Sequence, residues 1–257
     1  MIQTKIQKIL KDFSGNVAVY YRNLSTGETI EINANQKWEG ASCLKVFVLV
    51  ELLNRVRSGE LKLDQRVTVK ATDYIEGSGI LKHLDHGMNL TIKDLATLMM
   101  IVSDNVATNI LMDMLGIESI NKMIKSFGLK QTVIHNKIDW TKTKFCTFTA
   151  KEYGDFFQVI LRDDLAMQIM RDGKYQEMIK SPSMQNSKDV KQIISKSGKV
   201  KTVRNDGGVV CTTSGNYIFV VLLKDFDDPD CKNDGVYQIG LDISELCFNH
   251  FINTEVI

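Results

Sequence analysis

Ser42 and Lys45 stand three residues apart in the stretch GASCLKVFVL, at the start of a strongly apolar run. On a helix, side chains three positions apart share one face, with their Cβ atoms about 5–6 Å apart. Burial disfavours the charged form of an amine, so a partly buried lysine has a lowered pKa and can act as a base. The pair could therefore be a serine nucleophile with its own general base.

The spacing alone does not establish this chemistry. S-x-x-K arises by chance about once in a chain of this size at average residue usage. Ser119 and Lys122 have the same spacing, in a segment that we interpret as an ordinary solvated helix face. The nucleophile hypothesis therefore depends on polar groups elsewhere in the chain.

A second polar group, Ser103-Asp104-Asn105, interrupts the apolar residues that follow LATLMMIV. Such a triplet could supply a proton relay and an amide that holds a substrate. It could equally be a helix junction, in which Ser103 or Asp104 caps the next helix, NVATNILMDML. The triplet by itself leaves both interpretations open.

A third polar group, Lys196-Ser197-Gly198, follows two isoleucines that we interpret as part of an inner strand. A lysine on an inner strand needs a partner, and a glycine allows a ligand or a backbone segment to approach closely. An edge-strand lysine is the plainer alternative. Four cations, at positions 196, 199, 201 and 204, crowd this short segment and favour an anionic substrate.

The elements that must position these residues are strands at both ends of the chain and helices between them. Runs rich in β-branched and aromatic residues predict two hairpins, 16–23 with 28–33 and 207–213 with 216–224. Helical periodicity covers 236–252. In the middle, Thr91 with Asp94 and Thr149 with Glu152 have the spacing of capping boxes at helix starts, and Gly128 stands where a helix should end.

This order of elements predicts a mixed α/β (α+β) fold. An antiparallel sheet is built from the N- and C-terminal segments and flanked by helices, and a second lobe is all helical. We expect residues 1–40 and 190–257 to form the sheet-plus-helix lobe and residues 41–189 the helical lobe that carries the nucleophile helix. A cleft between two such lobes is the natural place for a site.

The composition excludes several classes of function. With 257 residues, 44% of them hydrophobic, the chain can bury a sizeable core, and a net charge of +1 argues against a nucleic-acid or membrane partner. Five scattered cysteines without C-x-x-C spacing favour a reducing compartment and argue against structural zinc, so we expect no metal and no cofactor. We expect a monomer, cytoplasmic as the sequence stands and extracytoplasmic if a signal peptide has been removed.

Taken together, the three polar groups match the S-x-x-K, S-D-N and K-T-G motifs of serine β-lactamases and penicillin-binding proteins, with serine in place of the threonine. The chain resembles a class A β-lactamase over nearly its whole length. The most specific part of the resemblance is the continuous segment GMNLTIKDLATLMMIVSDNVATNILM. The resemblance implies a β-lactamase/transpeptidase-like fold.

The resemblance also implies catalytic roles. Ser42 would be the nucleophile at a helix N-terminus, where the helix dipole favours developing negative charge. Lys45 would accept the serine proton, directly or through water. Ser103 would relay a proton to the leaving nitrogen with help from Lys196.

Substrate binding is implied by the same resemblance. Asn105 would hold the amide side chain of the substrate, and Ser197 would meet its carboxylate. The backbone N–H groups of Ser42 and of Lys199, the residue after Gly198, would form the oxyanion hole. The implied substrate-binding set is Asn105, Ser197, Gly198, Lys199 and Arg204, the last where family members often carry a carboxylate-binding arginine.

One part of the family pattern is missing. Class A β-lactamases carry a glutamate, within E-x-x-L-N, that activates the water for deacylation. The corresponding stretch here, VIHNKIDWTKTKFCTFTAKEYG, has no glutamate before Glu152. Asp139 is the only carboxylate available in that loop, and its side chain is one methylene shorter.

The sequence thus predicts a serine hydrolase or acyltransferase that forms an acyl-Ser42 intermediate on an amide or β-lactam bearing a carboxylate. Its small or peptide-like substrate could be cleaved in a β-lactamase-like or a D-amino-acid peptidase- or transacylase-like reaction. The alternative is a penicillin-binding sensor or binding domain that is acylated without turnover. A third alternative is a degenerate relative retained for interaction with a partner.

Overall fold

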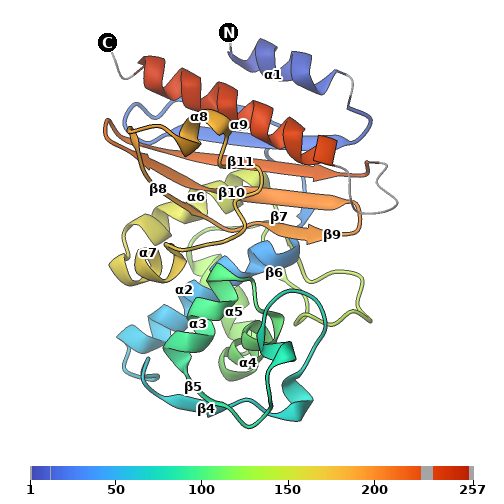
Figure 1. Ribbon diagram of the computed structural model, residues 1–257, viewed down its shortest axis with the longest axis vertical. Coiled ribbons are helices and arrows are strands. Elements are labelled where there is room, and N and C mark those ends of the chain that lie inside the picture. Colours follow the sequence, from blue (N-terminus) through green and yellow to red (C-terminus); the bar gives the residue numbers. More distant parts are fainter. Residues whose placement is uncertain (1, 12, 227–233, 255–257) are drawn as a thin grey trace. The chain divides into compact units, whose positions relative to one another are not determined.

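The computed structural model describes residues 2–11, 13–226 and 234–254 (Figure 1). The chain divides into two compact units, each described below by itself. Unit 1 comprises Met1–Cys43, Phe148–Gln158 and Gln176–Ile257, and unit 2 comprises Leu44–Thr147 and Val159–Tyr175.

Unit 1 is built on an antiparallel sheet with the strand order β2-β1-β11-β10-β8, and β9 also pairs with β10. Three strands have the bounds expected to within one residue at either end, and β10 starts four residues earlier than predicted. The predicted α/β fold with a sheet made from both ends of the chain is therefore confirmed. The strands are β1 (Asn16–Asn23), β2 (Thr29–Ile32), β8 (Val190–Ser195), β9 (Gly198–Val200), β10 (Val203–Thr212) and β11 (Asn216–Lys224), with the short β3 (Trp38–Glu39) before the candidate nucleophile.

Helices cover both faces of this sheet. On one face, α1 (Ile2–Leu10) and α9 (Asp234–Thr254) lie side by side (Figure 1), and α8 (Pro182–Gln185) contacts α9. This face holds an apolar core in which Phe219 and Val221 of β11 pack with Ile243 of α9. Because both faces are covered, seven consecutive residues of β11 are buried, and its sequence is uniformly apolar rather than alternating.

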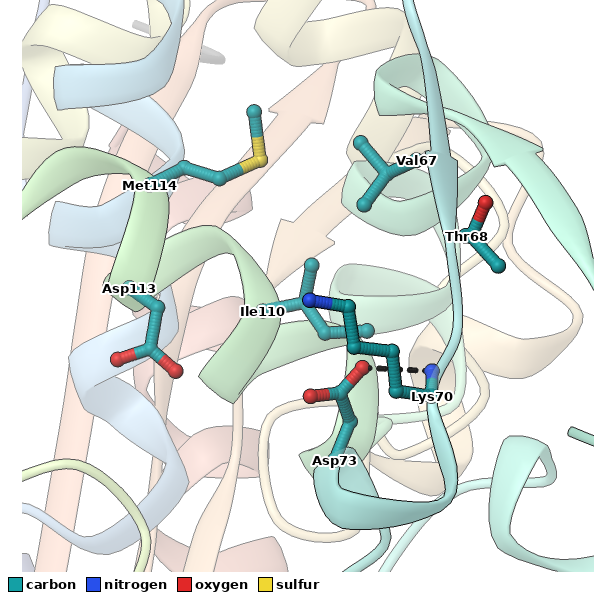
Figure 2. Close-up of a pocket in the computed structure, with 7 residues that line it drawn as sticks. All are labelled: Val67, Thr68, Lys70, Asp73, Ile110, Asp113 and Met114. Atoms are coloured by element: carbon teal, nitrogen blue, oxygen red, sulfur yellow. Dashed lines mark hydrogen bonds between the residues drawn. The ribbon is translucent and has the colours of Figure 1, made fainter. Parts of the chain in front are cut away.

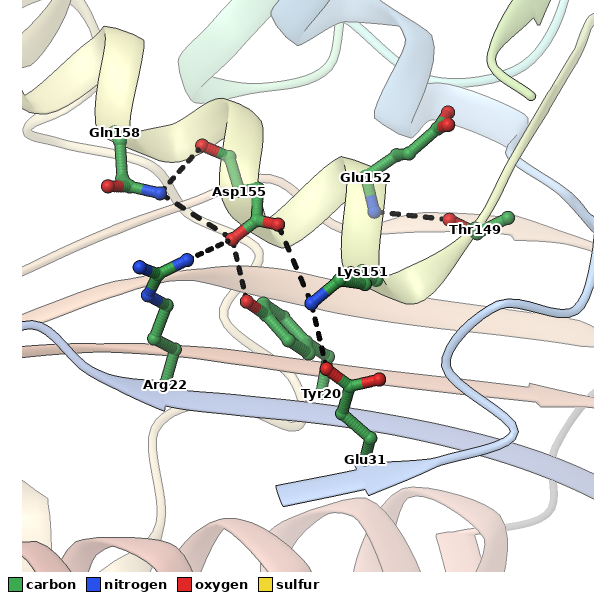
Figure 3. A network of polar contacts seen from close by, with 8 residues as sticks. All are labelled: Tyr20, Arg22, Glu31, Thr149, Lys151, Glu152, Asp155 and Gln158. Atoms are coloured by element: carbon green, nitrogen blue, oxygen red, sulfur yellow. Dashed lines mark hydrogen bonds and ion pairs between the residues drawn. The ribbon is translucent and has the colours of Figure 1, made fainter. Parts of the chain in front are cut away.

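The other face of the sheet carries the first part of α6 (Ala150–Leu161) through a polar network (Figure 3). The hydroxyl of Tyr20 on β1 donates to Asp155 Oδ1 at 2.6 Å, and Arg22 Nη1 donates to the same oxygen at 3.2 Å. Lys151 Nζ donates to Glu31 Oε1 at 2.7 Å. Burial, followed by the Asp155 carboxylate, raises the pKa of Tyr20, which keeps it a hydrogen-bond donor here.

A buried carboxylate, Asp206 on β10, should make the stability of the protein depend on pH. Its Oδ2 accepts from the backbone N–H groups of Met178 and Ile179 at 2.9 and 3.1 Å. Burial is the main cause that raises the pKa of this carboxyl from 3.8 to about 7. A carboxyl whose pKa is raised by folding binds its proton more tightly in the folded state, so its contribution to stability is lost as the pH rises from about 4 through about 7.

Urea unfolding of wild type and Asp206→Asn at pH values of about 4.5 and about 7.5 checks this expectation. The wild type should lose more unfolding free energy than the variant between the two pH values. The same pH dependence in both proteins would contradict the assignment to Asp206.

Unit 2 is mainly helical, with short strands in addition to its helices, and it is arranged around α2 (Lys45–Arg57). All residues of α2 from Lys45 through Leu53 are buried, Glu51 included. The other helices are α3 (Ile92–Ile101), α4 (Asn105–Leu115), α5 (Ile117–Ser126) and α7 (Asp164–Met170). Short elements connect them: η1 (Ala41–Leu44), which crosses from unit 1, β4 (Arg66–Thr68), η2 (Ala71–Asp73), η3 (Leu81–His83), β5 (Asn89–Thr91), β6 (Val133–Ile134) and β7 (Cys146–Phe148).

The helix-end signals of the sequence behave as predicted. Thr91 Oγ1 accepts from Asp94 N, and Thr91 N donates to Asp94 Oδ2, both at 3.0 Å. Gly128 follows α5 with a φ of +79°, a left-handed conformation that favours glycine. No helix within the described part of the chain is long and apolar enough to cross a membrane. Cys211 and Cys247 are free thiols, Cys43 and Cys146 are buried, and Cys231 lies outside the described residues.

Candidate active site

Lys45 is the first residue of α2, directly after the η1 turn that contains Ser42. Its side chain is fully buried, and its ammonium makes three contacts with one short segment of unit 2. Nζ donates to the backbone carbonyl of Ser103 at 2.6 Å, to Ser103 Oγ at 2.9 Å and to Asn105 Oδ1 at 2.9 Å. The structure thus brings together three of the predicted site residues: Lys45 from α2, Asn105 from α4, and Ser103 from the segment between α3 and α4.

The Ser103-Asp104-Asn105 triplet forms the junction between α3 and α4. Asp104 is the N-cap of α4, and its Oδ1 accepts from Ala107 N at 3.0 Å. The capping interpretation therefore holds for Asp104, while its neighbours contact Lys45. Ser103 has a φ of +55°, a left-handed conformation that is strained for a serine and is often found at functional sites.

Asp104 also binds the loop that contains Gly79, which the sequence did not predict to lie near the site. Its Oδ2 accepts from the backbone N–H groups of Ile80 and Leu81 at 2.7 and 2.9 Å. An ideal Cβ on Gly79 would lie 2.4 Å from the Asp104 carboxylate, so no larger residue fits there. Gly79 also has a φ of +108°, and the two glycines in EGSGI were the available signal.

Asn105 is held on its other side by the same loop. Its Nδ2 donates to the backbone carbonyl of Glu76 at 3.1 Å, and Trp140 Nε1 donates to that carbonyl at 2.9 Å. The amide of Asn105 therefore has a fixed orientation, with its oxygen on Lys45 and its nitrogen on Glu76. The indole of Trp140 lies beside it, with 52% of its surface exposed.

In unit 1, Lys196 directly follows β8. The prediction of an inner strand is wrong, because β8 stands at the end of the strand order and β10 is its only neighbour in that order. Lys196 is nevertheless only 2% exposed, and its Nζ donates to Ser197 O at 2.8 Å. Its own carbonyl accepts from the Tyr153 hydroxyl at 2.7 Å and from Cys43 Sγ at 3.4 Å. Burial lowers the pKa of the Lys196 ammonium.

Gly198 lies directly against the turn that carries Ser42, also within unit 1. An ideal Cβ on Gly198 would lie 2.8 Å from both Gly40 O and Ser42 N, so only glycine permits this approach. Asn205, which pairs with Gly198 across β9 and β10, donates from Nδ2 to Glu39 O at 2.8 Å. The backbone of the β9–β10 hairpin and the backbone N–H of Ser42 are therefore neighbours.

Arg204 and Asp139, the candidates for binding the substrate carboxylate and for activating water, make other contacts. The guanidinium of Arg204 is buried on the α9 side of the sheet, where it donates to Lys201 O at 2.6 Å and stacks over the rings of Phe226 and Tyr237. Asp139 Oδ1 accepts from the backbone N–H and the hydroxyl of Thr141 at 2.9 and 2.7 Å. These hydrogen bonds lower the pKa of Asp139, so it is a weaker base than an ordinary carboxylate.

The other S-x-x-K segment has a different environment. Ser119 is half-buried, donates to Glu51 Oε1 at 2.7 Å and accepts from Arg55 Nη2 at 2.8 Å. The interpretation of a solvated face is wrong for Ser119, because this ion-paired network covers it. Lys122 is exposed, so the segment has no buried amine beside its serine.

A cleft of about 290 Å³ in unit 2 lies apart from these residues (Figure 2). Val67 and Thr68 of β4 and Ile110 of α4 contribute to its lining. Lys70 and Asp73 also line it, and the backbone N–H of Lys70 donates to Asp73 Oδ2 at 2.8 Å as part of a turn. None of the predicted site residues lines this cleft. Within the described residues, no group of three or more His, Cys, Asp or Glu side chains could hold a metal ion.

Comparison with curated proteins finds β-lactamases. The β-lactamase SME-1 of Serratia marcescens is 29% identical over 126 residues, which cover 48% of this chain and 42% of that protein. The β-lactamase VEB-1 of Pseudomonas aeruginosa is 21% identical over 271 residues, which cover 97% of this chain and 90% of that protein. The matches to SME-1 and to CARB-4 of Pseudomonas aeruginosa, at 42% and 47%, span less than half of those proteins.

Solved structures share the fold over the whole chain. The class A β-lactamase of Mycobacterium abscessus superimposes with a TM-score of 0.86 at 20% identity, covering 98% of this chain and 99% of that one. A mutant of PBP-A, solved as an acyl-enzyme complex with penicillin G, gives a TM-score of 0.82 at 24% identity, covering 95% of each chain. The model of the β-lactamase enzyme family matches residues 1–251. Because that match spans almost the whole chain, this protein belongs to the β-lactamase enzyme family.

Proposed function

We propose that this protein is a serine acyl-transfer enzyme that forms an acyl-Ser42 intermediate on a β-lactam or amide bearing a carboxylate. The observation that carries the proposal is the buried ammonium of Lys45, bound to Ser103 Oγ and Asn105 Oδ1 three residues after Ser42. A fully buried lysine is unfavourable unless its partners compensate it, and such groups are typical of active sites. Membership of the β-lactamase family supports the same chemistry.

In the proposed acylation, Lys45 acts as the amine, which keeps two of its three hydrogen bonds and uses the freed lone pair to accept the proton of Ser42, while Ser42 Oγ bonds to the substrate carbonyl carbon. The bond from that carbon to nitrogen then breaks, and the nitrogen takes up a proton through Ser103. The 2.9 Å hydrogen bond between Lys45 Nζ and Ser103 Oγ supports this route, because it lets the proton taken from the nucleophile pass on to the relay. One proton is thus moved and none is consumed.

Several further residues are assigned to substrate binding in the proposed reaction. Asn105 Nδ2 and Oδ1 are the amide atoms that would recognise the substrate's own amide. Lys196 and Ser197 supply the charge and hydroxyl for its carboxylate. The N–H groups of Ser42 and Lys199 are the proposed donors to the oxyanion, supported by the close approach of Gly198 to Ser42 N. We assign Arg204 a packing role, because its guanidinium lies between aromatic rings.

Deacylation is the slow step of this proposal. No glutamate precedes Glu152 in the loop that carries it in class A enzymes, and Asp139 is engaged by Thr141. An acyl-enzyme without an activated water persists. This observation favours the second candidate function, a β-lactam-binding protein that keeps its acyl group, over rapid hydrolysis.

Intact-mass spectrometry after mixing with benzylpenicillin, beside a nitrocefin turnover assay, tests the proposal. We expect an adduct of one benzylpenicillin per chain in the wild type and none in Ser42→Ala. Ser119→Ala, which alters the other S-x-x-K segment, should keep the adduct. No adduct in the wild type would overturn the proposal, and an adduct that persists in Ser42→Ala would move the nucleophile elsewhere, with Cys43 the first candidate.

The lowered pKa of Lys196 predicts how acylation depends on pH. A lysine binds a carboxylate only while protonated, and its charge is lost as the pH rises through its pKa. Because burial lowers that pKa from the usual 10.5, acylation by an anionic β-lactam should decline at a less alkaline pH than an ordinary lysine would give. The second-order rate of adduct formation, measured against pH in wild type and Lys196→Arg, checks this. The arginine variant should lack the decline, and an identical profile would contradict the assignment.

A further inference from the structure

Trp140 is a large aromatic side chain that the fold holds in place and leaves exposed. The chain has two tryptophans, and Trp38 is only 1% exposed, whereas Trp140 is 52% exposed. Leaving an indole in water forgoes the stabilisation of about 25 cal/mol per Å² that burial would bring. An exposed tryptophan kept in one orientation is therefore a candidate for contact with a ligand.

The orientation of Trp140 is fixed by two contacts. Its Nε1 donates to Glu76 O at 2.9 Å, so the polar edge of the ring is occupied. Phe145 lies edge-on to it, with ring centroids 5.5 Å apart and an angle of 82° between the rings. Both contacts involve residues of unit 2, and together they leave apolar surface of the ring exposed.

The position of Trp140 links it to Asn105. Glu76 O accepts from both side chains, and Gly77 lies between them. An ideal Cβ on Gly77 would be 2.5 Å from Asn105 Nδ2 and 2.7 Å from Trp140 Cζ2. The indole and the amide are therefore separated by little more than one glycine. Ile80, from the same loop, adds a further apolar side chain that is 46% exposed.

We propose that Trp140 is a specificity-determining residue, which packs against a flat apolar acyl group attached to the substrate amide that Asn105 holds. This inference rests on the proposed function and narrows its substrates to N-acyl amines or β-lactams with an aryl-containing acyl group. Aromatic contacts of this kind contribute about 0.5–1.5 kcal/mol beyond the area that they bury. The preferred substrate therefore carries an aromatic group next to its amide.

Benzylpenicillin and 6-aminopenicillanic acid provide a matched pair of probes, because the second lacks the acyl group altogether. The measured quantity is the ratio of their second-order acylation rates. We expect this ratio to fall about tenfold in Trp140→Ala, equivalent to about 1.4 kcal/mol, and to be largely restored in Trp140→Phe. Phe127→Ala, at an aromatic residue that is 43% exposed at the end of α5, should leave the ratio unchanged. An unchanged ratio in Trp140→Ala would overturn the inference.

A second measurement separates failure of this inference from failure of the proposed function. In Ser42→Ala, reversible binding of each probe is followed by indole fluorescence, with Ser42→Ala/Trp140→Phe as the blank for Trp38. We expect benzylpenicillin to quench Trp140 and to bind about tenfold more tightly than 6-aminopenicillanic acid. Equal binding without quenching would overturn the role of Trp140, whereas absence of acylation in the wild type would overturn the acyl-enzyme proposal alone.

Discussion

Lys45→Met should lower the rate of Ser42 acylation by about 10²–10⁴-fold, the range typical of a lost general base. Methionine is unbranched like lysine, one atom shorter, and suits a buried site, but it has no group that accepts the serine proton. It also removes the donor to Ser103 Oγ, so the proposed relay to the leaving nitrogen is broken at the same time. Time-resolved intact-mass measurement with benzylpenicillin gives the rate directly.

The controls for this variant address folding. Loss of the Nζ contacts leaves Ser103 O and Asn105 Oδ1 without that donor, which should lower the unfolding free energy by about 1–3 kcal/mol. Urea unfolding verifies that the variant is folded where acylation is measured. Lys122→Met, in the other S-x-x-K segment, should acylate at the wild-type rate. Wild-type acylation in Lys45→Met would exclude Lys45 as the base.

Asp104→Ala should lower the free energy of unfolding by about 3–5 kcal/mol, the largest stability effect that we expect from the site. The carboxylate is fully buried and accepts from three backbone N–H groups, those of Ala107, Ile80 and Leu81. Alanine leaves all three donors without this acceptor, and each unsatisfied donor is unfavourable by about 1–3 kcal/mol, partly relieved by relaxation of the loop.

Asp94→Ala is the matched control for Asp104→Ala. Asp94 also helps to cap a helix, but it is exposed and binds one N–H group, that of Thr91. Its loss should lower stability by about 0.5–2 kcal/mol, as for other capping residues. Urea unfolding of both variants gives the comparison. Equal effects would show that Asp104 acts only as a helix cap and that the loop around Gly79 is held by other contacts.

Much of the fold was predictable because its signals are local. β11 is a run of β-branched and aromatic residues, and its predicted bounds match those observed. β10 was predicted to start at Gly207 and starts at Val203, because Asn205, Asp206 and Gly207 have low strand propensity and are held in the strand by pairing with β11. Tertiary pairing here overrides the local preference.

The late predicted start of β10 also explains why Arg204 was predicted to bind the substrate. In a strand, side chains alternate between faces, so residues 204, 206, 208 and 210 share one face. Val210 belongs to the core beside α9, and Arg204 lies on that side. With the strand predicted to begin only at Gly207, this alternation could not be traced back to Arg204. The prediction for Arg204 therefore depended on its position near the K-S-G motif.

The loop of residues 76–80 could not be predicted from spacing. Its contacts with Asp104 and Asn105 run through backbone N–H and C=O groups, which every residue possesses. Only the glycines of this loop indicated a close approach of its backbone to other residues, and glycine occurs in loops for several other reasons. By contrast, the contact of Lys45 with Ser103 joins two residues that the motifs had already assigned to one site, whereas the contact of Lys45 with Asn105 was not predicted.

The close approach of Gly198 to the turn before α2 bears on the energy barrier of the proposed acylation. The Ser42 peptide lies against Gly198 on one side, and Asn205 donates to the carbonyl of Glu39, three residues before Ser42. Dipoles that are oriented when the chain folds need no reorganisation when charge develops on a substrate oxygen. The N–H group of Ser42 is therefore oriented during folding, before any substrate binds. Substrate-binding energy is not needed to orient it and instead contributes to selectivity among acyl groups.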